Sequence, residues 1–310
     1  MRVLQFPGLG LEIPMERVAF TVPGLGTPVY WYGLIIVTGL LLAAWFCSKQ
    51  APKFGLTDEN VTDMLLYAIP ACLVGARLYY VVFYLDLYRR ADGSLDFGAM
   101  VRIWDGGIAI YGAVIAAIIV VYIFCKVKKL SFLAFADLGI MGLFIGQSIG
   151  RWGNFVNMEA YGGVTDVAWR MTSTQIADEL LRKGQVDAAA YEELLSGTLG
   201  VHPTFFYESL WNLVGLLLVL WLVKKGRKFD GQNFFVYLAW YGLGRFWIEG
   251  LRTDSLYLFG TGLRVSQMVA LVSVVIGVGL FVLYSRKKAG QPLYVEEIKA
   301  KEAANDGESA

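Results

Sequence analysis

The sequence predicts an all-α polytopic membrane protein with about seven transmembrane helices, and three observations support this class. Hydrophobic residues make up 56% of the 310-residue chain and charged residues 17%, whereas an ordinary soluble domain is about 25% charged. The apolar residues gather in segments close to the roughly 20 residues that a bilayer-spanning helix needs. Lysines and arginines follow every second segment, which is typical of the cytoplasmic ends of membrane helices.

Residues 1–28 precede the first apolar segment and are expected to form an extracytoplasmic leader. They contain several prolines and no long apolar core, so we predict an irregular or amphipathic stretch and not a signal peptide. The transmembrane domain is expected at residues 29–285. Its apolar segments lie at residues 29–47, 64–85, 106–125, 132–149, 205–223, 234–250 and 263–284.

Two polar regions complete the expected organisation. Residues 163–200, between the fourth and fifth segments, carry two short amphipathic patterns, which predict a small extracytoplasmic cap over an outward-facing site. Residues 286–310 are rich in lysine and glutamate and are expected to form a disordered cytoplasmic tail.

The expected orientation follows from the basic residues at the segment ends, because lysine and arginine favour the cytoplasmic side. These residues are Lys49, Lys53, Lys126, Lys128, Lys129, Lys224, Lys225, Arg227, Lys228, Arg286, Lys287 and Lys288. They place the N-terminus outside the cell membrane and the C-terminus in the cytoplasm. The end of the fourth segment then faces outward.

The composition argues against several classes of function. A net charge of +1 gives no electrostatic reason to expect a nucleic-acid partner. Cys47, Cys72 and Cys125 lie in apolar runs without CxxC spacing, so we expect buried, inert thiols. His202 is the single histidine, which argues against a histidine-rich zinc site. We therefore expect neither a metal nor a cofactor.

The stretch at residues 150–163 is the most polar part of the expected membrane region. It combines an arginine, two asparagines, a glutamate and several glycines where the fourth apolar segment ends. Ionisable groups within a membrane mark functional sites, since each costs roughly 2.5–3.5 kcal/mol at the bilayer centre. The others inside or beside the apolar segments are Arg77, Asp137, Glu208, Arg245 and Glu249.

Three arginines on separate segments favour a single anionic ligand. Arg77, Arg151 and Arg245 all fall in the outward halves of their segments. A guanidinium binds phosphate through two hydrogen bonds and stays charged in any environment. Asn154 and Asn157 add neutral donors beside Arg151. The pattern therefore predicts a site for a phosphodiester headgroup.

Structural roles stay open for several of these residues. Asp137 and Glu208 could pair with basic residues only to hold helices together. Arg245 and Glu249 are four residues apart and could pair within one helix. Arg77 follows Gly75-Ala76, where small residues let helices approach closely, and could join two helices.

Residues 150–162 read Gly-Arg-Trp-Gly-Asn-Phe-Val-Asn-Met-Glu-Ala-Tyr-Gly, and this stretch resembles the signature of the bacterial phosphatidylglycerol–prolipoprotein diacylglyceryl transferase family. Further segments resemble the family in the same order, so that the resemblance covers about residues 28–286. These segments are Tyr30-Trp31-Tyr32-Gly33, Gly75-Ala76-Arg77-Leu78, Trp104-Asp105-Gly106-Gly107, His202-Pro203-Thr204 with Tyr207-Glu208, Gly244-Arg245-Phe246 with Glu249 and Arg252, and Arg264-Val265-Ser266-Gln267.

The resemblance implies a transferase of the bacterial cell membrane. Such enzymes move the sn-1,2-diacylglyceryl group of phosphatidylglycerol onto the lipobox cysteine thiol of a prolipoprotein, forming a thioether and releasing glycerol phosphate. The partners are therefore phosphatidylglycerol, prolipoprotein signal peptides and the bilayer. Because the nucleophile is the substrate's cysteine, the enzyme needs no catalytic cysteine of its own.

The resemblance also implies roles for particular residues. The implied catalytic residues are Arg151, Arg245, Tyr32, Asn154, Glu159 and Tyr111. The implied phosphatidylglycerol-binding residues are Arg151, Arg77, Asn157, Gly162, Glu249, His202 and Glu208. Three alternatives remain: an interfacial aromatic anchor for Tyr32, orientation of Arg151 by Glu159, and a helix-start role for His202.

Tyr111 departs from the family pattern. Many members carry a histidine at this position, whereas the chain reads Ile108-Ala109-Ile110-Tyr111-Gly112. An unperturbed tyrosine has a pKa near 10, against roughly 6.5 for histidine, so tyrosine is a poor base at neutral pH. We hypothesise that electrostatic stabilisation of the thiolate and the phosphate dominates, without a dedicated histidine base.

Two other classes of function compete with this interpretation. A transporter or flippase for an anionic lipid would also use buried arginines, but no inverted repeat is visible and the polar residues lie toward the outer ends. A membrane scaffold with structural ion pairs would not need the polar insert or the neutral donors of the signature.

Overall fold

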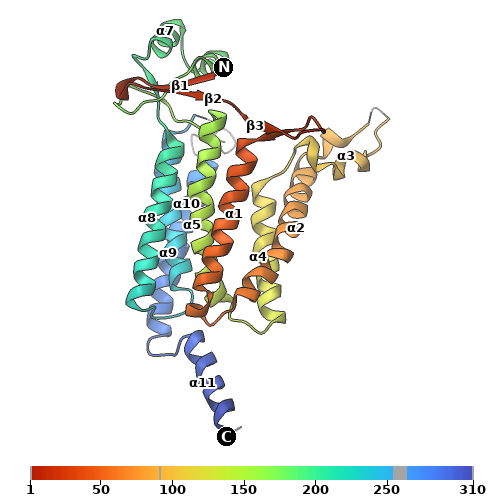
Figure 1. The fold of residues 1–310 in the computed structure, drawn as a ribbon, viewed down its shortest axis with the longest axis vertical. Helices are drawn as coiled ribbons and strands as arrows, with labels where there is room; N and C mark the ends of the chain where they lie inside the picture. Colours follow the sequence, from red (N-terminus) through yellow and green to blue (C-terminus); the bar gives the residue numbers. More distant parts are fainter. Residues whose placement is uncertain (1, 91, 254–263, 309–310) are drawn as a thin grey trace. The chain divides into compact units, whose positions relative to one another are not determined.

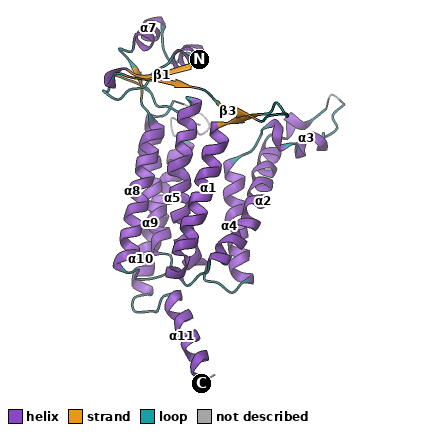
Figure 2. Cartoon of the chain, in the orientation of Figure 1, coloured by secondary structure: helices purple, strands orange, loops and turns teal. Residues whose placement is uncertain are grey.

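The structure of the protein is a computed structural model that describes residues 2–90, 92–253 and 264–308. It is mainly helical (Figure 2), which confirms the expected all-α class. Among the described residues, six helices are long and apolar enough to cross a membrane, so the chain is a multi-pass membrane protein. They are α1 (Trp31–Gln50), α2 (Asp58–Phe83), α4 (Ile110–Val127), α5 (Phe132–Asn157), α8 (Thr204–Lys225) and α10 (Val265–Lys287).

The remaining expected segment forms helix α9 (Gln232–Leu251). Its 20 residues span about 30 Å at about 1.5 Å per residue, but its polar content keeps it outside the group of six apolar helices. Glu249 is buried in its second half, and α9 packs against both α8 and α10. The sequence therefore predicted this helix, although it is less apolar than its neighbours.

The chain divides into two compact units. The first contains Met1–Phe46 and Gly139–Gln291, and the second contains Cys47–Leu138 and Pro292–Ala310. In the first unit, α8, α9 and α10 lie side by side (Figure 1). Small residues permit this packing, because a Cβ added at Gly242 of α9 would lie 2.6 Å from the carbonyl oxygen of Ala270 in α10.

The leader forms β-structure, whereas an irregular stretch was expected. Strand β1 (Arg2–Phe6) pairs antiparallel with β2 (Leu11–Met15) around the short 3-10 helix η1 (Pro7–Leu9), and β3 (Val18–Thr21) pairs with β4 (Pro28–Tyr30). In a strand alternate side chains point to one face. Leu4 is fully buried in this way, so the first hairpin has an inward face.

The insert contains the two short helices that the sequence predicted. They are α6 (Thr174–Arg182) and α7 (Ala188–Ser196). The side chains of Ser173 and Asp187 cap them by accepting hydrogen bonds from backbone N–H groups in the first turn, which satisfies donors that lack helical partners. Strands β5 (Val164–Thr165) and β6 (Gly200–Val201) pair with each other and close the insert.

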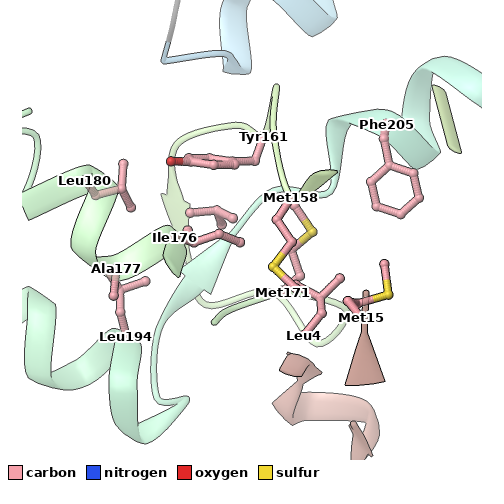
Figure 3. Close-up of a cluster of buried hydrophobic side chains, with 11 residues drawn as sticks. Leu4, Met15, Met158, Tyr161, Met171, Ile176, Ala177, Leu180, Leu194 and Phe205 are labelled. Carbon is pink, nitrogen blue, oxygen red and sulfur yellow. The ribbon is translucent and has the colours of Figure 1, made fainter. Parts of the chain in front are cut away.

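The first hairpin and the insert share one hydrophobic core (Figure 3). We call residues 2–15 and 158–203 the head. Its core also receives Phe205 from the first turn of α8. Other members are Leu4, Met15, Met158, Tyr161, Met171, Ile176, Ala177, Leu180, Leu194 and Val201. The second half of the 150–163 signature is therefore part of the head, because Met158 and Tyr161 are fully packed there.

In the second unit, α2 and α4 lie side by side (Figure 1). A Cβ added at Gly75 would lie 2.7 Å from the carbonyl oxygen of Gly112, so the two backbones approach closely. The loop between these helices contains η3 (Leu85–Tyr88), α3 (Phe97–Val101) and η4 (Ile103–Asp105).

The tail, expected to be disordered, contains helix α11 (Tyr294–Glu308). Its alanine, glutamate and lysine residues have high helix propensity. The beginning of α11 packs near η2 (Ala51–Phe54), and the Cα atom of Val295 lies 2.9 Å from a Cβ built at Gly55. Local propensity and this contact together account for the helix.

Candidate functional site

Three arginines of the first unit converge on one buried carboxylate, that of Glu208. Glu208 lies near the start of α8 and is 5% exposed. Arg151 of α5 forms an ion pair with Oε2 of Glu208. Nη1 of Arg245 in α9 lies 3.3 Å from Oε1, and Nη1 of Arg252, just after α9, lies 3.5 Å from the same atom. Glu208 therefore connects three separate segments.

Glu249 provides a second buried carboxylate beside this centre. Nη2 of Arg245 lies 2.6 Å from Oε2 of Glu249, one helical turn away. Arg264 donates a hydrogen bond from Nη1 to the backbone carbonyl of Glu249. The intrahelical pair considered from the sequence is thus present, but Arg245 also bridges to Glu208. Arg245 therefore lies between the two buried carboxylates.

A chain of side-chain amides links Arg151 to Glu159. Nη1 of Arg151 donates to Oδ1 of Asn154 at 3.3 Å, and Nδ2 of Asn154 donates to Oε1 of Glu159 at 3.0 Å. Nδ2 of Asn157 donates to the same carboxylate oxygen at 3.3 Å. These contacts agree with the alternative in which Glu159 orients Arg151. Asn154 connects the two side chains, because it accepts from Arg151 and donates to Glu159.

The backbone after α5 turns through two unfavourable conformations. Met158 has φ 55° and Ala160 has φ 57°, in the left-handed region that costs non-glycine residues roughly 1–2 kcal/mol each. The Met158 side chain is buried in the head core, and the carbonyl of Ala160 accepts a hydrogen bond from Thr204 Oγ1. The surrounding packing therefore holds the strained turn that presents Glu159.

Gly162 lies where three segments meet. A Cβ at this position would be 2.8 Å from the Cβ of His202 and 2.9 Å from the carbonyl oxygen of Leu251. Its N–H donates to the carbonyl of His202 at 2.9 Å, and the N–H of Gly163 donates to that of Leu251 at 2.7 Å. Glycine is required at position 162 because the backbone of Leu251 and the Cβ of His202 leave no room for a side chain. The N–H groups of Gly162 and Gly163 are both used in hydrogen bonds to backbone carbonyls.

Tyr32 packs against the signature from α1. A Cβ added at Gly153 would lie 2.7 Å from Cδ2 of the Tyr32 ring, so the ring lies directly over the backbone of α5. The Tyr32 side chain is partly exposed. Tyr32 therefore contacts α5 at the residue before Asn154, one helical turn before Asn157.

His202 belongs to a hydrogen-bond chain at the start of α8. The indole N–H of Trp169 donates to the Tyr207 hydroxyl at 2.6 Å, and that hydroxyl lies 3.2 Å from Nδ1 of His202. Indole is a donor only, so the hydroxyl accepts from Trp169 and donates its own hydrogen to Nδ1. Burial lowers the pKa of His202, which favours this neutral form with Nδ1 as acceptor.

An apolar groove of about 250 Å³ lies in the same unit. The β1–β2 hairpin of the head lines one side of the groove. The first turn of α8 and the last turns of α5 line the other side. Trp152 and Phe155 contribute to its lining and follow Arg151 and Asn154 directly in the chain. The apolar groove therefore lies directly beside the polar residues of α5.

Arg77 and Tyr111 belong to the second unit. The Arg77 guanidinium donates to the carbonyls of Ala99, Met100, Gly106 and Gly107. Tyr111 lies in the first turn of α4, is 46% exposed, and has its ring 6.2 Å from that of Tyr79. Arg77 thus joins α2 to the loop that follows it.

Sequence reasoning did not assign a role to Arg252. It appeared only as part of the motif after the sixth segment, although its spacing places it about one turn beyond Glu249 and two turns beyond Arg245. In the structure it contacts Glu208 and its backbone pairs with Gly162. Within the described residues, no group of histidine, cysteine, aspartate or glutamate side chains is arranged to hold a metal ion.

Comparison with known proteins identifies the family. The family model described as prolipoprotein diacylglyceryl transferase matches residues 17–283. A phosphatidylglycerol–prolipoprotein diacylglyceryl transferase of Lysinibacillus sphaericus is 45% identical over 278 residues, which cover 90% of this chain and 95% of the relative. Proteins of the same name from Listeria monocytogenes (serotype 4b) and Geobacillus kaustophilus are 38% and 37% identical, over 94% and 92% of this chain and 96% and 98% of the relatives. The chain therefore belongs to the prolipoprotein diacylglyceryl transferase family.

Proposed function

We propose that the chain transfers the sn-1,2-diacylglyceryl group of phosphatidylglycerol to the lipobox cysteine of prolipoproteins, the first step of lipoprotein maturation. The observation that carries this proposal is the convergence of Arg151, Arg245 and Arg252 on Glu208 in a chain that belongs to the transferase family. Such a cluster of guanidiniums suits a phosphate group whose negative charge increases during the reaction.

The chemistry explains why cations are needed. The cysteine sulfur forms a bond to the glyceryl methylene carbon while the bond from that carbon to the phosphate oxygen breaks. The electron pair leaves with the oxygen, so a phosphodiester becomes the more negative phosphate monoester of glycerol phosphate. Arg151 and Arg245 are proposed to stabilise this developing charge, because preorganised cations are most effective where charge appears in the transition state.

The remaining site residues of the first unit are proposed to support these two arginines and the headgroup. Asn154 and Glu159 orient Arg151, and Asn157 can offer its amide to the glycerol oxygens. Tyr32 is proposed to contact the reacting lipid over the turn that contains Gly153. The proposed lipid-binding set also retains Glu208, Glu249, Gly162 and His202, which hold the arginines and the adjoining backbone in place.

The family resemblance implies lipid binding by Arg77 and catalysis by Tyr111. For Arg77 the four carbonyl contacts favour an indirect role through the loop after α2. For the substrate thiol, ionisation from a pKa of about 8.5 costs only about 2 kcal/mol at neutral pH. Arginines near the thiol would lower this cost, so the reaction does not depend on a histidine at position 111.

The proposed location is the bacterial cell membrane, with the N-terminus outside and the C-terminus in the cytoplasm. The support is the set of lysines and arginines at the ends of alternate apolar segments. In this orientation the head and the arginine cluster are on the outer side, where secreted prolipoproteins present their lipobox cysteine.

The test uses purified full-length protein, phosphatidylglycerol vesicles and a lipobox peptide. The expected result is a diacylglyceryl mass addition on the peptide's cysteine and release of glycerol phosphate. A peptide with serine in place of the cysteine is the matched control and should gain no mass. Absence of transfer, with movement of lipid between leaflets instead, would support the rival transporter.

A further inference from the structure

We propose that Glu208 is the resting occupant of the phosphate site. In this proposal, which rests on the function proposed above, the lipid's phosphate displaces the Glu208 carboxylate from the arginines, and the carboxylate returns when glycerol phosphate leaves. Arg252 is then a third phosphate-binding residue beside Arg151 and Arg245. Glu208 acts through these arginines and is a positioning residue.

The contacts of Glu208 are those that a bound phosphate would make. Oε2 pairs with Arg151, and Oε1 pairs with both Arg245 and Arg252. Arg245 also pairs with Glu249, so an incoming phosphate needs to take over only the contacts to Glu208. A phosphate group has more oxygens and more charge than a carboxylate. It therefore suits three guanidiniums better than Glu208 does.

Solvent exposure indicates how a ligand can reach the arginines. The side chains of Arg151, Arg245 and Arg252 are 24%, 21% and 11% exposed, whereas that of Glu208 is 6% exposed. The guanidiniums therefore have accessible edges, and the carboxylate lies beneath them. A phosphate can approach the accessible edges first and take over the ion pairs from Glu208 without leaving the arginines unpaired at any point.

The surroundings of Glu208 favour its return. The cavity beside it, also lined by Arg245, Trp211 and Asn212, is only about 10 Å³, roughly the space of one water molecule. The carboxylate can move aside by about the width of one water molecule, so it stays close to its arginines after the phosphate has taken over the ion pairs. A nearby negative charge weakens the binding of an anion, so Glu208 promotes release of glycerol phosphate, which is more negative than the lipid phosphodiester.

The empty site also needs an anion. Three guanidiniums held around one point repel each other, since like charges at short distance are strongly unfavourable inside a protein. Glu208, with Glu249 as a second partner of Arg245, offsets this repulsion and helps to keep Arg151, Arg245 and Arg252 in place before lipid binds. The same carboxylate therefore preorganises the arginines and competes with the product.

The test is the Glu208→Gln variant, which keeps the size of the side chain and removes its charge. We expect glycerol phosphate to inhibit this variant at concentrations at least about tenfold lower than the wild type. The kcat should fall because product leaves slowly, while KM for phosphatidylglycerol should not rise. Glu193→Gln, on the exposed surface of α7, makes the same charge change in the head and should leave the inhibition constant unaltered.

Glu208→Asp provides a second variant if the glutamine variant does not fold. It keeps the charge that balances the arginines but shortens the side chain by one methylene, so a smaller tightening of glycerol phosphate is expected. Folded variants with unchanged or weaker inhibition would overturn the proposal and leave a helix-joining role for Glu208. If the wild type binds glycerol phosphate but transfers no diacylglyceryl group, the proposed function fails instead.

Discussion

Arg77 of the second unit and Arg151 of the first unit are bound in different ways. In the second unit, the Arg77 guanidinium donates to backbone carbonyls of the loop that follows α2, including Ala99 and Gly107. It also lies over the ring of Tyr88, 5.3 Å from the ring centroid. In the first unit, Arg151 and its neighbours contact carboxylate and carboxamide side chains.

This difference separates an arginine that can exchange partners from one that cannot. A carboxylate on a side chain can move aside when a phosphate arrives, and the charge balance of the site is kept. Backbone carbonyls cannot move without unfolding the loop that carries them, and leaving them unpaired is costly. We therefore expect Arg151 to act in ligand binding and Arg77 to act in folding, although both residues are arginines at the edges of apolar helices.

The largest expected effect is that of Arg151→Ala. Loss of one preorganised charge at the reacting phosphate should lower the transfer rate by about 10²–10³-fold. The fold should survive, because Glu208 keeps Arg245 and Arg252 as partners. Transfer rate and Tm should be measured on the same preparation. Activity within tenfold of the wild type would contradict the proposed role.

Arg77→Gln tests the other side of the comparison. Hydrogen bonds from a charged donor contribute roughly 1.5–3 kcal/mol each, so this variant should unfold at a clearly lower Tm and should be cut more readily by protease at residues 96–107. The control is Arg102→Gln, which removes an exposed pair with Asp105 that contributes at most about 1 kcal/mol. A higher KM for lipid at unchanged Tm would instead assign Arg77 to the lipid site.

Gly162→Ala tests how far the site depends on its backbone. The new Cβ would collide with the backbone carbonyl of Leu251 and the Cβ of His202, and overpacking of this kind costs about 1–3 kcal/mol. Gly163→Ala is a matched control, since the nearest atom to its Cβ would be 3.8 Å away. Equal Tm and transfer rate for both variants would show that close packing at Gly162 is not needed.

His202 gives a pH dependence with a definite sign. Burial lowers its pKa in the folded protein, so the unfolded chain takes up the proton first as the pH falls below about 6.5. Stability is therefore complete above that value and declines at lower pH. In His202→Asn, whose side-chain oxygen can still accept from Tyr207, this decline in Tm should become smaller. Loss of transfer in a folded variant would show that His202 takes part in lipid binding or catalysis.

The membrane helices could be predicted because apolar length is a local property of the chain. The β1–β2 hairpin could not, since strands are stabilised by partners and by a core that Leu4 shares with the insert. Arg151, Asn154 and Glu159 could be predicted as site residues because they lie within one short signature. The central position of Glu208 and the contacts of Arg252 join distant segments, which the order of residues in one chain does not reveal.

Tyr111→Phe is expected to have the smallest effect. The hydroxyl lies on an exposed side chain in the first turn of α4, and a tyrosine is a poor base at neutral pH. If the arginines of the first unit supply the electrostatic stabilisation, transfer by the folded variant should stay within about threefold of the wild type. A threefold change corresponds to less than about 1 kcal/mol in the activation free energy. The rate is measured with purified variant and lipobox peptide. Near-total loss of turnover in a folded protein would mean that the position of the family's histidine retains a proton-transfer role, and that cationic residues alone do not activate the thiol.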